Sequence, residues 1–479
     1  MCLKIAQINF QAHSFVYKNI VRADGNIRLS IGEFMKLLFV SLGCDKNLVD
    51  SEEMLGLLTA NGFEIVDDET RAEVIVVNTC CFINDAKEES VNTILEMAEY
   101  KKEGTCKVLI VTGCMAQRYK NEIIEEVPEV DAVLGTTSYG DILKAINEAM
   151  DGKHFQEFKD IDYLPEKLGK RVLTTGGHFG YLKIAEGCDK HCTYCIIPKL
   201  RGKFRSVPME RLVAQAQEMA EEGVKELILV AQETTVYGTD IYGKKSLHIL
   251  LKELCKIKGI RWIRVLYCYP EEIYDELIQT MKEEKKICHY LDLPIQHASD
   301  RILKRMGRRT TQAELVAIVN KLRQEIPDIV LRTTLITGFP GETQEDHEEL
   351  MGFVDEMEFD RLGVFTYSPE EDTPAADMPD QIPEEVKEER RDEIMELQQE
   401  ISYDKGTDRI GQELMVMIEG KVADESAYIG RTYGDAPKVD GYIFVQTGEL
   451  LMTGDFAKVR VTGALEYDLI GELADEYTE

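Results

Sequence analysis

The segment EGCDKHCTYCIIPKLRG (186–202) places three cysteines within eight positions: Cys188, Cys192 and Cys195. It directly follows YLKIAEG (181–187), a short apolar run of the kind that forms a buried strand. The sequence therefore predicts a loop after a strand, with three thiols in the pattern C-x3-C-x2-C. Three is an unusual number, because a closed metal site in a protein normally takes four ligands.

The number of thiols separates the possible kinds of metal site. A structural zinc ion takes four ligands, usually as two separated pairs. A 4Fe-4S cluster also normally takes four thiolates, so three of them leave one iron open to a substrate or cofactor. We interpret Cys188, Cys192 and Cys195 as the ligands of such a cluster. A zinc site and chance clustering are the alternatives.

Six strand-like runs, separated by amphipathic helical patterns, extend from this loop toward the C-terminus. They are YLKIAEG (181–187), ELILVAQ (226–232), RWIRVLYC (261–268), YLDLPIQ (290–296), VLRTTLITG (330–338) and RLGVFTYS (361–368). This alternation is typical of βα units around a parallel sheet. Because a complete barrel of this kind has eight units, six predict a partial (β/α)6, TIM-like barrel with a lateral opening for a large substrate.

A second set of strand-like runs lies upstream and also carries cysteines. These runs are KLLFVSLGC (36–44), EVIVVNTC (73–80), KVLIVTGC (107–114) and AVLG (132–135). Together with the helical patterns between them they predict an α/β domain with a doubly wound parallel sheet. Three of the runs end in Cys44, Cys80 and Cys114. In open parallel sheets the C-terminal strand ends line the ligand crevice, so we expect these thiols to converge.

The pattern changes again after residue 383. PEEVKEERRDEIMELQQEISYDK (383–405) predicts a charged helix, and short strands with Gly and Asp turns from Met415 onward predict a small antiparallel β-barrel. The expected parts are an N-terminal extension (1–34), the doubly wound domain (35–150), a linker (151–178), the partial barrel (179–402) and the β-barrel (403–479). Since MKLLFVSLGC reads as the beginning of a domain, we expect Met35 to be the natural start and 1–34 to be translated leader.

Composition restricts the cellular compartment and the kind of partner that we expect for the protein. A hydrophobic content of 44% is globular, no apolar run reaches the roughly 18 residues of a membrane helix, and no signal-peptide pattern opens the chain. We therefore expect a cytoplasmic protein without a membrane partner, whose twelve cysteines are metal ligands or buried thiols rather than disulfides. The net charge of −32 argues against direct nucleic-acid binding and favours a basic protein partner, with solubility as the plain alternative explanation.

The C-x3-C-x2-C loop after the first strand of a partial barrel resembles the radical S-adenosylmethionine (SAM) superfamily. The resemblance implies that the open iron binds SAM, which one electron cleaves to a 5′-deoxyadenosyl radical. It also implies positions for individual cofactor contacts. These are Tyr194 near the adenine, Ala231 and Gln232 at the methionine amino group, Gly338 near the adenosine, and Gln296 and His297 facing the cofactor. Simple packing is the alternative for Tyr194, a tight turn for Gly338, and a hydrogen-bonded core residue for the neighbouring His297.

The upstream cysteines extend the resemblance to the methylthiotransferase family. SLGCDKNLVDSE (41–52), VNTCCFI (77–83) and TGCMAQRY (112–119) match three segments that hold a second 4Fe-4S cluster in that family. The implied ligands are Cys44, Cys80 and Cys114, although Cys81 departs from the small residue that usually follows the second ligand. The implied reaction converts C–H to C–SCH3: the radical removes hydrogen, sulfur comes from the second cluster, and a second SAM supplies the methyl group. Three buried thiols without metal are the alternative.

Three segments favour the branch of this family that modifies the β-carbon of an aspartate in small-subunit ribosomal protein twelve, the RimO type. They are CIIPKLRGKFRS (195–206), AQETTVYG (231–238) and IGRTYGDAPKVDGYIFV (429–445). Charge points the same way: residues 415–479 hold 13 acidic and 5 basic residues, a net charge of −8. An RNA-binding barrel is normally basic, whereas an acidic TRAM-like barrel suits a basic ribosomal protein, free or on the assembled subunit.

Two other functions remain open from the sequence. One is a tRNA adenosine 2-methylthiotransferase, the other main branch of the family. The other is an iron–sulfur carrier or electron-transfer protein, against which the partial barrel and the three-cysteine loop argue, since a carrier would saturate its clusters with thiolates. The resemblance further implies a flavodoxin or ferredoxin-type reductant as a partner.

Overall fold

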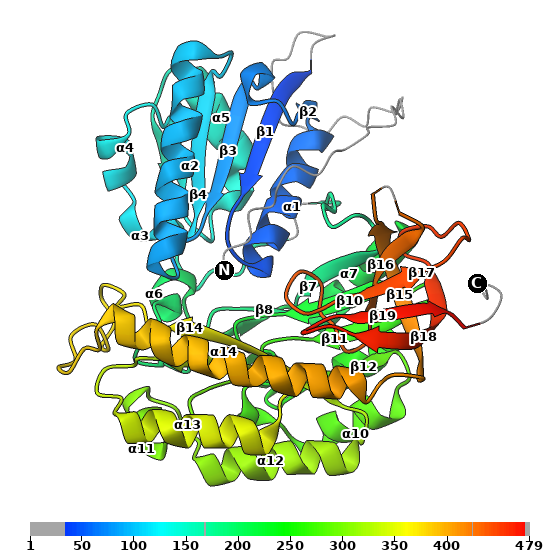
Figure 1. The fold of residues 1–479 in the computed structure, drawn as a ribbon. Coiled ribbons are helices and arrows are strands. Elements are labelled where there is room, and N and C mark those ends of the chain that lie inside the picture. The colour runs from blue at the N-terminus through cyan, green and yellow to red at the C-terminus, as the bar shows by residue number, and fades with distance from the viewer. Residues whose placement is uncertain (1–33, 167–168, 424, 475–479) are drawn as a thin grey trace. The chain divides into compact units, whose positions relative to one another are not determined.

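The computed structural model describes residues 34–166, 169–423 and 425–474 (Figure 1). The chain forms two compact units. The N-terminal unit runs to Thr174 and also contains Ile196–Lys203, and the C-terminal unit comprises Thr175–Cys195 and the chain from Phe204 onward. The expected N-terminal extension lies outside the described residues, apart from Phe34.

The N-terminal unit is built on a six-stranded parallel sheet in the order β2-β1-β3-β4-β5-β6. Its strands are β1 (Met35–Ser41), β2 (Phe63–Ile65), β3 (Val74–Thr79), β4 (Val108–Gly113), β5 (Ala132–Leu134) and β6 (Phe155–Glu157). Its helices are α1 (Asp45–Ala60), η1 (Glu69–Arg71), α2 (Asn84–Glu103), α3 (Cys114–Tyr119), α4 (Glu122–Glu126), η2 (Tyr139–Asp141), α5 (Ile142–Met150) and α6 (Ile197–Arg201).

Helices cover both faces of this sheet, which confirms the doubly wound prediction. Side chains alternate along a strand, so in β3 Val74 and Val76 join a core with α1 and α5, while Ile75 and Val77 join a core with α2 and α3. All six residues of β3 are buried, as expected for a central parallel strand. The sequence analysis missed the two edge strands, β2 and β6, the latter within the segment expected to be a linker.

The C-terminal unit contains the open six-stranded parallel sheet that the sequence predicts, in the order β14-β13-β12-β11-β10-β7. Its strands are β7 (Phe179–Lys183), β10 (Glu226–Val230), β11 (Trp262–Val265), β12 (Ile287–Gln296), β13 (Val330–Thr337) and β14 (Arg361–Thr366), and β8 (Ala185–Glu186) pairs with β9 (Arg205–Ser206) beside it. The helices are α7 (Met209–Glu221), α8 (Thr239–Tyr242), α9 (Leu247–Cys255), η3 (Pro270–Glu272), α10 (Asp275–Glu283), α11 (Asp300–Arg305), α12 (Gln312–Glu325), α13 (Gln344–Met357) and α14 (Glu384–Thr407).

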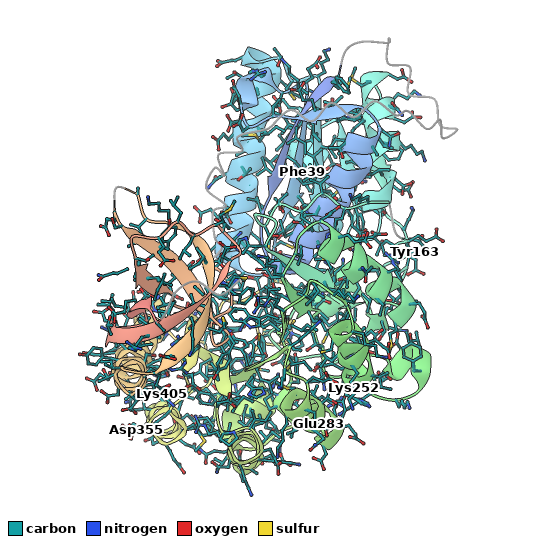
Figure 2. All side chains as sticks on the ribbon, turned by 90° about the vertical axis from the view of Figure 1, so that its right-hand side faces the viewer. Phe39, Tyr163, Lys252, Glu283, Asp355 and Lys405 are labelled. Carbon is teal, nitrogen blue, oxygen red and sulfur yellow. The ribbon has the colours of Figure 1, made fainter. Side chains whose placement is uncertain are left out.

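Two helices of this unit, α12 and α13, have clear sequence-encoded starts, and α9 and α10 carry charged side chains on their outer faces. Thr311 and Thr343 each begin a helix with a capping box, in which the threonine and the third helical residue satisfy each other's backbone N–H groups. Lys252 on α9 and Glu283 on α10 project from the outer surface, as Figure 2 shows. The apolar faces of α9 and α10 are buried, so the pattern is that of amphipathic helices covering a sheet.

A small closed barrel follows α14, as the sequence predicts. It has the strand order β15-β16-β17-β19-β18, and its strands are β15 (Glu413–Lys421), β16 (Ala427–Thr432), β17 (Ile443–Gln446), β18 (Phe456–Ala464) and β19 (Leu469–Leu473). Every pairing is antiparallel except that of β17 with β19, which is parallel. Tyr428 lies inside the barrel core, where it packs against the apolar side chains of the other strands.

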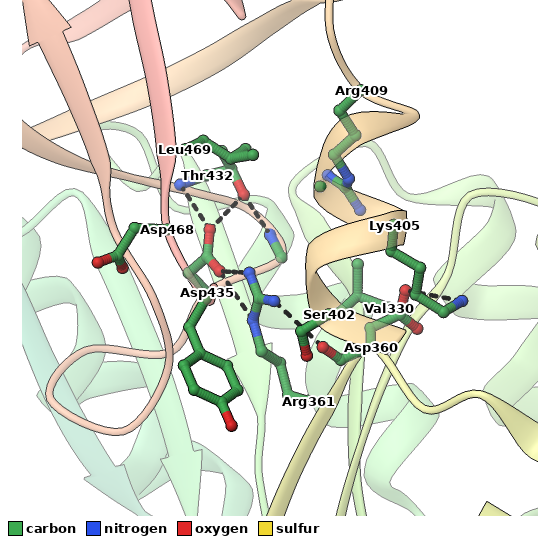
Figure 3. Close-up of a pocket in the computed structure, with 13 residues that line it drawn as sticks. Val330, Asp360, Arg361, Ser402, Lys405, Arg409, Thr432, Asp435, Asp468 and Leu469 are labelled. Atoms are coloured by element: carbon green, nitrogen blue, oxygen red, sulfur yellow. Dashed lines mark hydrogen bonds and ion pairs between the residues drawn. The ribbon is translucent and has the colours of Figure 1, made fainter. Parts of the chain in front are cut away.

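Buried ion pairs attach this barrel to the open sheet. Glu226, at the start of β10, accepts hydrogen bonds from Arg264 and from Arg431 of the barrel, each at 2.8 Å. Asp435 of the barrel accepts from Arg361 of β14 beside a cavity of about 20 Å³, which has room for a water molecule but not for a cofactor (Figure 3). Val330, at the start of β13, also lines this cavity. The cavity therefore lies at the N-terminal ends of the strands, away from the cysteine loop.

Within the described part of the chain, no helix is both long enough and apolar enough to cross a membrane.

Candidate functional site

The three-cysteine loop follows β7 and β8 at the C-terminal end of the first strand of the open sheet. Cys188 and Cys192 are buried and Cys195 is partly exposed. Thr193 holds the loop in place: its N–H donates to Met306 O, its hydroxyl donates to Arg305 O, and its own carbonyl accepts from Ala375 N–H, all at 2.9 Å. The loop geometry is therefore set by backbone contacts to α11 and to the segment after β14.

A polar cluster that the sequence analysis did not identify surrounds this loop. The Tyr269 hydroxyl lies 3.8 Å from Cys192 Sγ. Lys190 Nζ and Arg308 Cζ lie 5.0 and 4.3 Å from the centre of the Tyr269 ring. Lys190 pairs with Glu272, and Arg308 has two buried N–H groups, at Nε and NH1, without a hydrogen-bond partner. This side of the loop is thus rich in donors, which suits a site that holds negative charge.

The expected SAM-contacting residues after β10 carry an unsatisfied acceptor. Ala231 is fully buried, and Gln232 donates through Nε2 to Glu186 Oε1 at 2.9 Å. The other amide atom, Gln232 Oε1, is buried without a partner. The next residue, Glu233, is buried and accepts from Thr235, and burial raises its pKa to about 7. An ammonium group would satisfy the open Gln232 acceptor, so this residue fits its expected role.

The remaining expected contacts have structural explanations as well. Tyr194 packs edge-to-face on Phe339 at 6.4 Å, as part of an apolar cluster. Gly338 has φ of +69°, and a Cβ there would lie 2.1 Å from Lys387 Cγ, so close packing against α14 accounts for this glycine. Gln296 ends β12 with φ of +76°, and its amide donates to Pro294 O at 3.3 Å.

His297, beside Gln296, is a buried hydrogen-bonded residue. Its Nδ1 accepts from Ser299 N–H at 3.0 Å, so the proton resides on Nε2. That Nε2 lies 3.7 Å from the Glu342 carboxylate. Of the two interpretations that the sequence allowed, the contacts fit the packed core histidine.

The N-terminal cysteines follow three neighbouring strands. Cys44 is exposed after β1, while Cys80 after β3 and Cys114 at the start of α3 are buried. The loops after β1 and β3 meet closely: a Cβ added to Gly43 would lie 2.7 Å from Cys80 Cβ. The strand order β1-β3-β4 therefore places the three thiols at one edge of the sheet, as the sequence predicts.

Asn47 of α1 connects the three cysteine loops. Its amide N–H2 donates to Leu42 O at 3.1 Å and to Thr79 O at 3.0 Å, which precede Cys44 and Cys80. Its carbonyl oxygen lies 3.8 Å from Cys114 Sγ. The same oxygen accepts from Arg201, which also pairs with buried Asp50 at 2.8 Å. The sequence analysis did not identify this network, although SLGCDKNLVDSE contains Asn47 and Asp50.

The two cysteine sets are the donors that the implied iron–sulfur clusters would use. In residues 34–166, 169–423 and 425–474, no three His, Cys, Asp or Glu side chains surround one common point closely enough to hold a single ion. Ligands of a cluster each bind a different iron, so they need not meet in this way. Burial raises the pKa of Cys188 to about 11, and loss of its proton would accompany iron binding. Two separate sets of three thiols fit two clusters.

Comparisons with known proteins match the same three parts of the chain. Residues 36–135 match the uncharacterized protein family UPF0004, residues 182–354 match the Radical SAM superfamily, and residues 410–474 match the TRAM domain. Among solved structures, the radical SAM methyltransferase TsrM from Kitasatospora setae is similar with a TM-score of 0.52 and 13% identity, over 72% of this chain and 77% of that one. The cobalamin-dependent SAM radical enzyme OxsB has a TM-score of 0.50 at 15% identity, over 77% of this chain and 56% of that one. These likenesses show a shared fold.

Full-length relatives identify the family. The chain is 66% identical over 437 residues to the ribosomal protein uS12 methylthiotransferase RimO of Lachnoclostridium phytofermentans, with 91% of this chain and 99% of the relative covered. It is 53% identical over 443 residues to the protein of the same name from Clostridium perfringens, with 92% and 98% covered. The chain belongs to the family of RimO-type ribosomal protein uS12 methylthiotransferases.

Proposed function

We propose that this chain is a radical SAM enzyme that methylthiolates ribosomal protein uS12, replacing a hydrogen on the β-carbon of an aspartate by SCH3. Two relatives, 66% and 53% identical to this chain over nearly their whole length, are ribosomal protein uS12 methylthiotransferases, which supports the reaction and the substrate. The site of action in the cytoplasm is part of the same proposal.

The observation that carries the proposal is the pair of three-thiol sets at C-terminal strand ends. We assign Cys188, Cys192 and Cys195 to the cluster that binds SAM, and Cys44, Cys80 and Cys114 to a second cluster. Three thiolates leave one iron of each cluster open. When bound, the two clusters and SAM supply the electron, the hydrogen-abstracting radical, the sulfur and the methyl group.

The residues around Cys188, Cys192 and Cys195 would bind SAM and hold the cysteine loop in position. Glu186 fixes the Gln232 amide so that its open oxygen is available to the methionine ammonium group. The packed rings of Tyr194 and Phe339 offer an apolar surface on which an adenine could lie. Thr193 holds the cysteine loop against α11, so the thiols keep their relative places when the cofactor enters and leaves.

Charge supports a protein substrate over an RNA substrate. The segment 415–479 has a net charge of −8, which attracts a basic ribosomal protein and repels a phosphate backbone. We include a small reductant protein of the flavodoxin or ferredoxin type as the electron source, and leave free uS12 and the assembled small subunit both as possible substrates.

The deciding experiment compares a host that lacks this gene with the same host carrying it. Intact-mass analysis should show uS12 gaining SCH3 in place of H only when the gene is present, while nucleoside analysis of tRNA should show no change. Modified tRNA with unchanged uS12 would instead establish the adenosine branch. Absence of reductive SAM cleavage by the purified, reconstituted protein would favour an electron carrier.

A further inference from the structure

The hydroxyl of Tyr269 contacts a cysteine that we assign to the SAM-binding cluster. The hydroxyl lies 3.8 Å from Cys192 Sγ, across 77 positions of sequence. Tyr269 follows β11 and immediately precedes η3, so it approaches the cysteine loop from a different strand end. This contact lies outside the expected SAM-binding residues.

The chemistry of a bound cluster decides the direction of this hydrogen bond. Without iron, either the thiol or the phenol can donate. A cysteine that ligates iron is a thiolate and has no proton, so it can only accept. With a cluster in place, the Tyr269 hydroxyl must therefore be the donor to the sulfur of Cys192.

Two cations hold the Tyr269 ring in this position. Arg308 lies over the ring and pairs with Glu271 at 3.4 Å, while its NH2 also donates to Pro294 O at 3.2 Å. Lys190, which sits inside the cysteine loop, lies over the same ring and pairs with Glu272. Since Glu271 and Glu272 follow Tyr269 closely in the chain, the ion pairs fix its segment as well as its ring.

We propose that Tyr269 is a positioning residue that raises the midpoint reduction potential of the SAM-binding cluster by donating a hydrogen bond to Cys192. This rests on the proposed function, because it requires that Cys192 be a cluster ligand. Reduction adds one electron from the external reductant and no proton, so the reduced cluster carries one more negative charge. A donor to a ligand sulfur stabilises that charge, and hydrogen bonds to sulfur are a known determinant of cluster potentials.

The test is an EPR-monitored redox titration of the full-length, reconstituted chain carrying Tyr269→Phe. The relevant signal is the one that changes on addition of SAM, which separates it from the second cluster. We expect a more negative midpoint potential with an unchanged iron content. Tyr274→Phe is the matched control, because Tyr274 lies in the same chain segment as Tyr269 but its hydroxyl contacts His248 at 3.1 Å. Loss of the Tyr274 hydroxyl should leave the midpoint potential at the wild-type value.

Three outcomes would be decisive. An unchanged potential in Tyr269→Phe, with the cluster loaded, overturns the inference and leaves the proposed function standing. A wild-type chain that shows no SAM-responsive signal overturns the proposed function itself. If Tyr269→Phe fails to hold iron, Tyr269→3-fluorotyrosine keeps the ring and strengthens the donor, and the inference then requires a midpoint above the wild-type value.

Discussion

Single side chains set the positions of the thiols in both cysteine sets. Asn47 ties the backbones before Cys44 and Cys80 and lies beside Cys114. In the other set, Thr193 holds the cysteine loop by hydrogen bonds to backbone groups of α11 and of the segment after β14. Since the geometry depends on these residues, the two centres should be sensitive to changes at positions that bind no metal.

Gly43 offers a direct test of this dependence. It has φ of +90°, and a Cβ would lie 2.7 Å from Cys80 Cβ and 3.0 Å from Cys80 Sγ. Gly43→Ala should therefore displace Cys80 and reduce the iron bound at the second cluster, while destabilising the unit by about 1 to 3 kcal/mol through overpacking beyond the backbone strain.

Gly152→Ala is the control for the backbone strain alone. Gly152 has φ of +77° but open space around it, so its replacement should cost about 1 kcal/mol and leave the iron content unchanged. Thermal unfolding and iron analysis of both variants check the difference. Equal iron contents in the two variants would contradict the role given to Gly43.

The two cysteine sets should fail in different ways. Cys192→Ala should lose about four irons and abolish SAM cleavage, because its cluster loses one of three ligands. Cys44→Ala should keep SAM cleavage and lose sulfur insertion. Cys255→Ala, at a thiol on α9 outside both sets, should retain both activities. Cleavage is measured as 5′-deoxyadenosine, and survival of sulfur insertion in Cys44→Ala would refute the second-cluster assignment.

Spacing and position along the sequence predicted the thiols, but not the side chains around them. Cys188, Cys192 and Cys195 fall in one short loop, so their spacing is visible. Tyr269 and Arg308 reach the same loop from β11 and from beyond α11, and no local pattern marks two residues as future neighbours. Only the strand order of the sheet brings them together.

At the level of elements, α6 belongs to the N-terminal unit although it directly follows the cysteine loop of the C-terminal unit. Ile196 and Leu200 pack in the core that contains Cys114. Leu200 O accepts from the Thr136 hydroxyl at 2.8 Å, and Arg201 reaches Asp50 in α1. A short helix of five residues is thereby held by tertiary contacts, since isolated helices of this length are not stable.

The Arg201–Asp50 ion pair predicts a thermodynamic cycle. Both side chains are at most 5% exposed, so Arg201→Met should deprive the buried Asp50 carboxylate of this counter-charge and cost roughly 3 to 5 kcal/mol. The double variant Arg201→Met/Asp50→Leu should be more stable than the single one, because it also removes the buried carboxylate that lost its guanidinium partner. Urea unfolding measures the difference, and strictly additive effects would contradict a direct interaction.

Element length explains which strands could be predicted. Central strands such as β3 and β4 have six residues each and begin with four consecutive apolar residues, which is enough to recognise them from the sequence. The edge strands β2 and β6 have three residues each and mixed polarity, so local sequence carries little signal for them. The parallel pairing of β17 with β19 follows from closure of the barrel, which is a property of the tertiary structure.

At the scale of the whole chain, Glu226 joins parts that are about 200 positions apart in sequence. Burial alone would raise the pKa of Glu226, but the charges of Arg431 and Arg264 hold it below its ordinary value of 4.5. Glu226→Gln would leave the buried guanidinium of Arg264 without its carboxylate and would remove one of the two carboxylates of Arg431, which keeps its ion pair with Glu419. We expect it to cost roughly 3 to 5 kcal/mol in the free energy of unfolding, measured by urea unfolding at neutral pH.

The sign of the pH dependence follows from the lowered pKa. A carboxylate with a lowered folded pKa contributes stability that is present above its unfolded pKa and is lost as the pH falls through the folded value. Wild-type stability should therefore decline below about pH 4.5, and Glu226→Gln should show a smaller decline over the same range. If the free energy of unfolding of both proteins falls equally with pH, the pKa of Glu226 does not differ between the folded and unfolded states.

The segment that most clearly marks the branch, IGRTYGDAPKVDGYIFV, supplies Arg431, Asp435 and Asp440, and all three are engaged by residues of the open sheet. This segment of the small barrel therefore forms one side of a buried polar interface with the open sheet, although its sequence looks like a substrate-recognition motif. A chimera that exchanges the small barrel between the two branches would inherit mismatched charges unless Glu226, Arg264 and Arg361 were exchanged with it. A new substrate preference would have to evolve through changes in the exposed loops of the small barrel. The residues that join the small barrel to the open sheet would have to stay the same.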